Sequence, residues 1–371
     1  MLLISIAFIT PLVITMYLLV SEQLKTINFS QNEQLGVEYI VPLRQLIQHF
    51  PEHRGMTNAY LSGKESFRPK ILAKREQLIK DIKALDDVDQ RLGKQLETSS
   101  QWNSIKSTWQ TLESQAFNGP SKQVFARHTA LIAQVLELVK HISDKSNLTL
   151  DPELDSFYIK EAIVSLLPQV VENLGQARGM SSGLAARQAI TNKESIKLTA
   201  LISTVQKNIN ALKRGMQVLS GANAELSNKI SSQVRQAISD SEDYLKFLES
   251  EILNANQITV QSASVFSKGT SVIKANFNIL DMLAPELSNL LKIRIDGLHH
   301  RMTILSVSVF FITFLALYLF AGFYNSFISA IEKLKENASA LASGNLAPRV
   351  ELDNKDEFSD LAYSFNAMSD Q

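Results

Sequence analysis

The sequence predicts an all-α protein with two membrane-spanning helices and an elongated helical region between them. Three observations support this prediction. Two runs of about twenty apolar residues are each long enough to cross a bilayer core of about 30 Å. Elsewhere apolar side chains recur at spacings of three and four, as on one face of a helix. Only 14 glycines and 9 prolines occur in 371 residues, and these are the residues that helix interiors tolerate least.

The first predicted element is a membrane helix at residues 1–20, MLLISIAFITPLVITMYLLV, with no charged side chain before Glu22. A cleaved signal peptide is the alternative explanation. The run has no basic leader and no small-residue cleavage site, so an uncleaved helix is favoured. Because a basic leader is missing, we expect that the natural chain begins upstream of Met1 or at another start.

Residues 21–302 are predicted to form helical bundles, with breaks near residues 117–120 and 147–152. Two sets of apolar residues show the helical spacing best: Trp102, Ile105, Trp109 and Leu112, and Leu198, Val205, Ile209, Leu212, Met216 and Leu219. The 37 basic and 37 acidic residues cancel, which argues against a nucleic-acid partner. Cysteine is absent, so disulfides, thiolate metal sites and cysteine nucleophiles are excluded.

This region contains a diverged internal repeat. Residues 46–61 align without gaps to residues 170–185, at a constant offset of 124 positions. Both copies contain Arg-Gly-Met, beginning at Arg54 and at Arg178, followed by a hydroxyl side chain at Thr57 and Ser181. We therefore expect two bundles related by pseudo-symmetry, at about residues 21–145 and 146–302.

The repeated arginines are the candidate ligand-binding residues. A guanidinium binds carboxylate, nitrate or phosphate through paired hydrogen bonds, and the glycine after each arginine lets a partner approach the helix backbone. A salt bridge across the bundle, for example from Arg178 to Asp151 or Asp155, is the competing explanation. Both explanations stay open at this stage.

The sequence contains no pattern typical of catalysis. Asp151 and Asp155 could pair as an acid and a base, but no nucleophile motif, phosphate loop or metal spacing accompanies them. His49 and His53 are spaced as a metal-binding pair without an evident third ligand. We therefore predict a protein that is not an enzyme and has neither a cofactor nor a metal.

The second predicted span covers residues 303–324, inside a run without charged residues that extends from 303 to 331. Basic residues occur on both sides of it: Lys292, Arg294 and Arg301 before it, and Lys333 and Lys335 after it. The positive-inside rule therefore does not decide which side faces the cytoplasm.

Residues 325–371 contain two short heptad stripes: Ile331, Leu334, Ala338 and Leu341, and then Phe358, Leu361, Phe365 and Met368. The segment resembles a HAMP domain, the linker of bacterial chemoreceptors and sensor kinases. The matching parts are Gly344-Asn345-Leu346, Asp356-Glu357-Phe358 and Phe365-Asn366-Ala367-Met368. One departure is Ala330, which stands where such domains usually have a proline.

The HAMP resemblance implies that Leu346 joins the apolar core and that the C-terminal side is cytoplasmic. Residues 21–302 would then lie in the periplasm, with the chain in the bacterial inner membrane. Each short helix has only one narrow apolar stripe, so it needs partner helices. A homodimer with a parallel coiled coil of four helices follows.

A second resemblance concerns the region between the spans. The Arg-Gly-Met-Ser pattern is similar to the arginine-bearing helix of nitrate- and nitrite-sensing (NIT-like) all-helical domains. Residues 146–183 also resemble helical sensor domains that precede HAMP in chemoreceptors, diguanylate cyclases and hybrid kinases. Only Arg54 and Arg178 match the family's arginine positions, and the identity of the small anionic ligand stays open.

The favoured hypothesis is a methyl-accepting chemotaxis receptor that senses a small periplasmic ligand. It would relay the signal through HAMP to a cytoplasmic output module expected beyond residue 371. The alternative is the sensor part of a histidine kinase or a diguanylate cyclase, which only the downstream sequence would distinguish. A structural membrane coiled coil without a ligand is the third hypothesis.

Overall fold

The computed structural model describes residues 2–345, 347–352 and 357–370, and the side chains from residue 10 onward. It confirms the all-helical prediction: throughout these ranges the regular structure is helical. The helices are α1 (Leu2–Leu61), η1 (Glu65–Phe67), α2 (Arg68–Leu92), α3 (Ser99–Gln115), α4 (Ser121–Lys145), η2 (Leu148–Leu150), α5 (Leu154–Glu161), η3 (Ala162–Leu166), α6 (Leu167–Arg187), α7 (Asn192–Ala222), α8 (Ala224–Leu248), η4 (Glu249–Leu253), α9 (Ser262–Ala342) and α10 (Glu357–Ser369).

The chain divides into two compact units. One unit is Lys25–Leu298, called the 25–298 unit below. The other, called the terminal unit, combines Met1–Leu24 with His299–Gln371. The helices α1 and α9 each contribute residues to both units.

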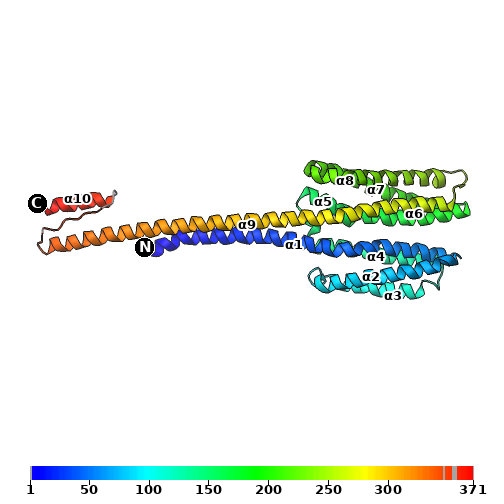
Figure 1. Ribbon diagram of the computed structural model, residues 1–371, viewed down its shortest axis with the longest axis horizontal. Coiled ribbons are helices and arrows are strands. Elements are labelled where there is room, and N and C mark those ends of the chain that lie inside the picture. Colours follow the sequence, from blue (N-terminus) through cyan, green and yellow to red (C-terminus); the bar gives the residue numbers. More distant parts are fainter. Residues whose placement is uncertain (1, 346, 353–356, 371) are drawn as a thin grey trace. The chain divides into compact units, whose positions relative to one another are not determined.

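Two helical bundles make up the 25–298 unit (Figure 1). The first bundle contains residues 25–61 of α1 with α2, α3 and α4, and the second contains α5, η3, α6, α7, α8 and residues 262–298 of α9. One continuous apolar core runs through both bundles. Its largest members include Trp102, Tyr39 and Phe50, all buried. This burial of one helix face against another is the main source of stability in such bundles.

Local sequence signals explain several helix ends. Thr191 and Glu194 form a reciprocal capping box at the start of α7, and Asn223 caps α8. A π-helical turn, η3, ends at Leu166, two residues before Pro168. Proline has no amide hydrogen for the ordinary bond to the carbonyl four residues earlier, so a local change of helical pitch is expected there.

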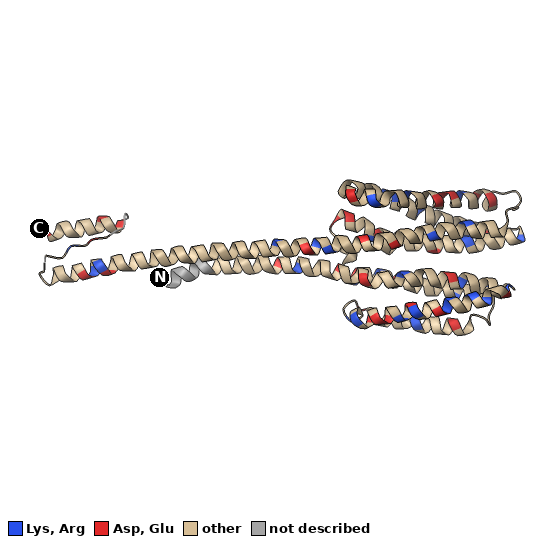
Figure 2. Cartoon of the chain, in the orientation of Figure 1, with Lys and Arg blue, Asp and Glu red and all other residues tan. Residues whose placement is uncertain are grey.

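In the terminal unit, α1 and α9 lie along each other near residues Met16, Val20, Met302 and Ser306. Among the residues that were described, α9 is long and apolar enough to cross a membrane, and none of its most apolar window is buried. Figure 2 shows the long stretch of α9 that lacks charged side chains. The other predicted span, residues 1–20, includes positions outside the described side chains and stays a prediction.

The C-terminal helix α10 runs parallel to the end of α9 (Figure 1). The rings of Phe327 and Phe358 meet at 5.3 Å in a perpendicular arrangement. The Asn366 side chain bridges both backbone groups of Val350, accepting from its amide at 2.8 Å and donating to its carbonyl at 2.9 Å. Ala330, at the position where a proline was expected, is buried inside the uninterrupted α9.

The predicted HAMP stripe is not enclosed within a single chain. Leu334, Phe365 and the other stripe residues are half-buried or exposed, namely Ile331, Ala338, Leu341, Phe358, Leu361 and Met368. Leu346, also predicted for this core, lies outside the described residues. The exposure fits the expectation that these helices need partners.

Candidate anion-binding site

Arg54 and Arg178 occupy pseudo-equivalent positions on α1 and α6, and each lies against the opposite helix. A Cβ atom added to Gly55 would lie 3.9 Å from Nη2 of Arg178. A Cβ atom added to Gly175 would lie 3.5 Å from Nη2 of Arg54. Both distances are ordinary van der Waals contacts, so a side chain would fit at either glycine. No atom lies within 4 Å of a Cβ built on Gly179, so the close approach expected at the glycine after each arginine is not seen there.

The Arg54 guanidinium is held by the last helix of the first bundle. It stacks over the Phe125 ring at 4.8 Å and donates to Oγ1 of Thr129 at 3.1 Å. Thr129 in turn donates to the carbonyl of Phe125 at 3.1 Å. Such stacking of a cation on an aromatic face is favourable and restricts the side chain to one position.

The Arg178 guanidinium is held in the same way by the last helix of the second bundle. It stacks over the Phe266 ring at 4.6 Å and donates to Oγ1 of Thr270 at 2.9 Å. Thr270 donates to the carbonyl of Phe266 at 2.8 Å. The pseudo-symmetry therefore extends beyond the arginines to the side chains that position them.

Sequence reasoning missed this second motif, Val-Phe-x-x-x-Thr, which occurs at residues 124–129 and 265–270. Its two copies are 141 positions apart, whereas the arginine repeat has an offset of 124. A comparison without gaps therefore cannot align both. The two copies differ at all three intervening positions, and at the last of them Gly269 stands where the first copy has His128. A Cβ atom at Gly269 would lie 2.8 Å from Cγ of Arg178. Glycine there makes room for the arginine.

The two arginines differ in their charge partners. Arg54 forms a paired ion bridge with Glu172 of α6, with Nη1 to Oε1 at 2.5 Å and Nη2 to Oε2 at 3.1 Å. The Arg54 side chain is only 2% exposed and that of Glu172 only 8%. A buried guanidinium and a buried carboxylate here neutralise each other with the geometry that both prefer.

Arg178 has no such partner among the carboxylates that the structure describes. Its Nε atom is buried without a hydrogen-bond partner, and burial lowers the pKa of the guanidinium. The salt bridges considered from the sequence are not formed. Asp151 pairs with Arg294 at 3.0 Å, and Asp155 accepts from Asn223 at 2.9 Å.

A small cavity of about 170 Å³ lies beside Arg178, between α1, α6 and α9. Polar side chains on its wall include Gln48, Glu52, Thr270 and Lys274. The Glu52 carboxylate forms an ion pair with Lys74 at 2.5 Å, so its charge is already compensated. The cavity thus has two cationic side chains, Arg178 and Lys274, and space for several atoms.

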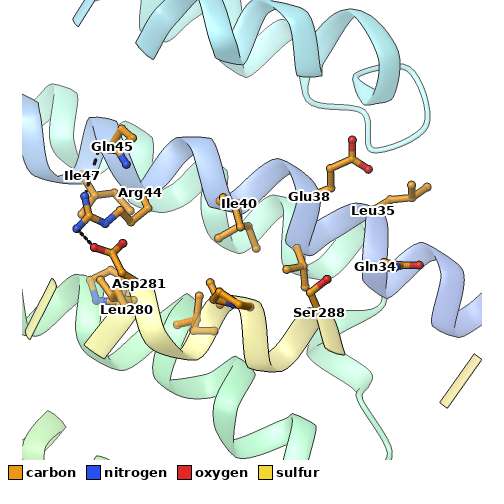
Figure 3. Close-up of a pocket in the computed structure, with 16 residues that line it drawn as sticks. Gln34, Leu35, Glu38, Ile40, Arg44, Gln45, Ile47, Leu280, Asp281 and Ser288 are labelled. Carbon is orange, nitrogen blue, oxygen red and sulfur yellow. Dashed lines mark hydrogen bonds and ion pairs between the residues drawn. The ribbon is translucent and has the colours of Figure 1, made fainter. Parts of the chain in front are cut away.

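A larger groove of about 650 Å³ lies between α1 and α9 and shares Ile47 with the cavity. Figure 3 shows its labelled residues, with Arg44 of α1 reaching Asp281 of α9. The Arg44 guanidinium also stacks over Phe277 at 4.8 Å, and Phe277 lines the cavity. Arg44 therefore contacts residues that line both the groove and the cavity.

The histidines do not form a metal site. His49 bonds to Asp81 at 2.6 Å, whereas His53 turns into the core and bonds to His128 at 2.8 Å. Burial lowers the pKa of His53 to about 2 and that of His128 to about 4, so both rings are neutral at physiological pH. Within the described ranges, no cluster of three metal-ligating side chains occurs.

Comparison with known proteins gives two family matches. The model of the NIT family, described as nitrate and nitrite sensing, matches residues 45–288. The HAMP domain model matches residues 322–371. No curated protein matches the sequence.

Among solved structures, that of the NasR transcription antiterminator is similar, with a TM-score of 0.57 over 80% of each chain. The two sequences are 12% identical, so the likeness concerns the fold alone.

Proposed function

The chain belongs to the nitrate- and nitrite-sensing (NIT) family, and from this premise we propose that it is a membrane sensor that binds nitrate or nitrite beside Arg178. The observation that supports this site is the difference between the two arginines. Arg54 is neutralised by Glu172, whereas Arg178 faces a cavity without an ion-pair partner in the described structure. Arg178 is half-buried, and its Nε atom is buried without a hydrogen-bond partner. Removing part of a cation from water without a counter-charge is costly, and an anion would reduce that cost.

The chemistry of the cavity suits a small planar oxyanion. Two oxygens of nitrate or nitrite can accept parallel hydrogen bonds from one guanidinium. Lys274 would supply a second positive charge, and the apolar ring of Phe277 would exclude water from one side. Such charge-assisted hydrogen bonds are stronger in a desolvated site than in water.

Signal transmission would use α9, which contributes Thr270 and Lys274 to the cavity and continues to Ala342. The HAMP segment that follows would convert a change in α9 into a change in helix packing. We place residues 21–302 in the periplasm and the chain, as a homodimer, in the bacterial inner membrane. Binding shifts this equilibrium only if the anion binds one signalling state more tightly than the other.

The output is proposed to be of the chemoreceptor type, with a histidine kinase or diguanylate cyclase module as the alternative. The deciding observation is the sequence that follows the HAMP segment in the natural gene. A long heptad hairpin with methylation sites would indicate a chemoreceptor. A His-containing kinase box or a Gly-Gly-Asp/Glu-Glu-Phe loop would indicate an enzyme.

The site can be tested by calorimetry on the full chain in detergent, with nitrate and nitrite as ligands and chloride as the reference anion. Arg178→Gln should abolish measurable binding of both ligands. Arg187→Gln is the matched control, because it removes another arginine from α6 whose ion pair is half-exposed. Equal binding by wild type and Arg178→Gln would overturn this site.

A further inference from the structure

An acid and an amide have exchanged places between the two pseudo-equivalent helices. On α6 the order is Glu172 and then Gln176, and Gln176 Nε2 donates to Glu172 Oε1 at 2.8 Å. On α1 the order is Gln48 and then Glu52, and Gln48 Nε2 donates to Glu52 Oε1 at 2.9 Å. The 124-residue offset aligns Gln48 with Glu172 and Glu52 with Gln176. Each helix thus keeps one carboxylate, but at positions one helical turn apart.

This exchange decides which arginine is neutralised. Glu172 pairs with Arg54 on the opposite helix. By the same pseudo-symmetry, the residue opposite Arg178 is Gln48, whose amide has no charge. The carboxylate of Glu52 is bound by Lys74 at 2.5 Å instead. Arg44 further holds Gln48 by donating to its Oε1 at 2.5 Å.

We propose that the two arginines form two equivalent anion-binding sites. The Glu172 carboxylate permanently occupies the site at Arg54, whereas the uncharged Gln48 leaves the site at Arg178 open for the ligand. The inference rests on the proposed function and adds what determines occupancy. A carboxylate and nitrate are both planar and both present two oxygens to a guanidinium. Glu172 is therefore a built-in counterpart of the ligand, and each chain binds one external anion.

Gln48 is the residue that determines this specificity. A carboxylate at position 48 would neutralise Arg178 from within and repel an incoming anion. The amide adds no negative charge to the wall of the cavity, while its oxygen remains bound to Arg44. Glutamate has nearly the same volume as glutamine, but at this position it loses the amide that donates to Glu52 Oε1 at 2.9 Å.

Three isosteric variants of the full chain in detergent test the inference by calorimetry with nitrate. Gln48→Glu should weaken binding at least about tenfold, because a like charge now faces the ligand at short range. Glu172→Gln should raise the stoichiometry from one nitrate per chain to two, because Arg54 becomes available. Glu286→Gln is the control: it removes a carboxylate that pairs with Lys229 away from the cavity and should keep one nitrate per chain.

Either of two results would overturn the inference. One is wild-type affinity in Gln48→Glu, which would show that position 48 does not face the bound anion. The other is a stoichiometry of one, with unchanged affinity, in a folded Glu172→Gln variant. If that variant melts too low for calorimetry, nitrate should restore its melting temperature toward that of wild type, and no restoration counts against the inference.

Melting temperatures measured in nitrate-free buffer distinguish a failure of this inference from a failure of the proposed function. In nitrate-free buffer, Gln48→Glu should lower the melting temperature more in a chain that also carries Arg178→Gln than in wild type, because Arg178 then no longer offsets the charge added beside Glu52. If wild type binds neither nitrate nor nitrite but this pattern is observed, the proposed ligand is wrong and the inference of two equivalent anion-binding sites stands. If wild type binds nitrate through Arg178 but Gln48→Glu changes neither the melting temperature nor the affinity for nitrate, only the inference of two equivalent anion-binding sites fails.

Discussion

Arg294 of α9 forms an ion pair 2.9 Å long with Glu33 of α1, although the Glu33 side chain is completely buried. The same guanidinium also binds Asp151 at 3.0 Å and Glu153 at 3.2 Å. One arginine thus joins α1, α9 and the segment before α5. Two of its three carboxylate partners, Glu33 and Asp151, are completely buried.

Glu33 is expected to make the stability of the protein depend on pH. Burial, together with the charge of Asp151, raises the pKa of Glu33 from 4.5 to about 7. The folded state therefore binds a proton more tightly than the unfolded state does. This contribution to stability is complete below pH 4.5 and is lost as the pH rises through about 7.

Melting followed by circular dichroism between pH 4.5 and 8 would measure this dependence. Glu33→Gln should flatten the decline, because glutamine does not ionise. Glu38→Gln, which removes a surface carboxylate paired with Arg91, should leave it unchanged. An equally steep decline in Glu33→Gln would contradict the assignment.

At pH 8, above the pKa of Glu33, Arg294→Gln should destabilise the fold by about 3–5 kcal/mol, because it leaves two buried carboxylates without their counter-charge. Denaturant unfolding of the full chain in detergent would measure the change. Lys229→Gln breaks the more exposed pair with Glu286 and should cost at most about 1 kcal/mol. Similar effects of the two substitutions would count against a special role for the buried cluster.

The two repeated arginines should respond differently to the same substitution. Arg54→Gln leaves Glu172 buried without a cation and should cost about 3–5 kcal/mol, whereas Arg178→Gln breaks no ion pair in the described structure and should cost much less. Replacing both Arg54 and Glu172 with methionine should recover most of the loss. Unfolding midpoints of these variants in ligand-free buffer would decide the point.

The HAMP stripe should be required for dimer formation. Leu334→Asp or Phe365→Asp would place a charge in the seam between chains and should shift the protein to monomers. Sedimentation in detergent would measure the shift. Tyr363→Asp is the control on α10, because Tyr363 is 78% exposed and lies off the predicted stripe. Dimers that persist in both seam variants would show that the interface lies elsewhere.

Labelling of single cysteines would test the topology, since the chain contains no native cysteine. Ser239→Cys on α8 and Ser343→Cys after α9 both replace exposed residues. With residues 21–302 in the periplasm, an impermeant maleimide should label the first variant in intact cells and the second only after lysis. The reverse pattern would exclude the proposed orientation.

The fold class could be predicted from the sequence because helical spacing is a local property. The apolar faces around Trp102 and Leu198 are buried as their periodicity indicates. The glycine that follows each arginine was less informative, because no atom lies within 4 Å of a Cβ built on Gly179. Contacts between residues distant in sequence could not be read in this way. Glu172 lies 118 residues from Arg54, and no local pattern reveals that it is the partner.

The free energy of anion binding limits how far a ligand in this cavity can shift the equilibrium between two signalling states. The cavity takes Gln48 from α1 and Thr270 from α9, the two helices that extend from the 25–298 unit into the terminal unit. An anion at one hundred times its dissociation constant supplies only about 2.7 kcal/mol. Two states separated at rest by much more than that could not be interconverted by nitrate at such a concentration. The proposed function therefore requires that the two signalling states of α1 and α9 differ at rest by a free energy small enough for a four-atom ion to reverse.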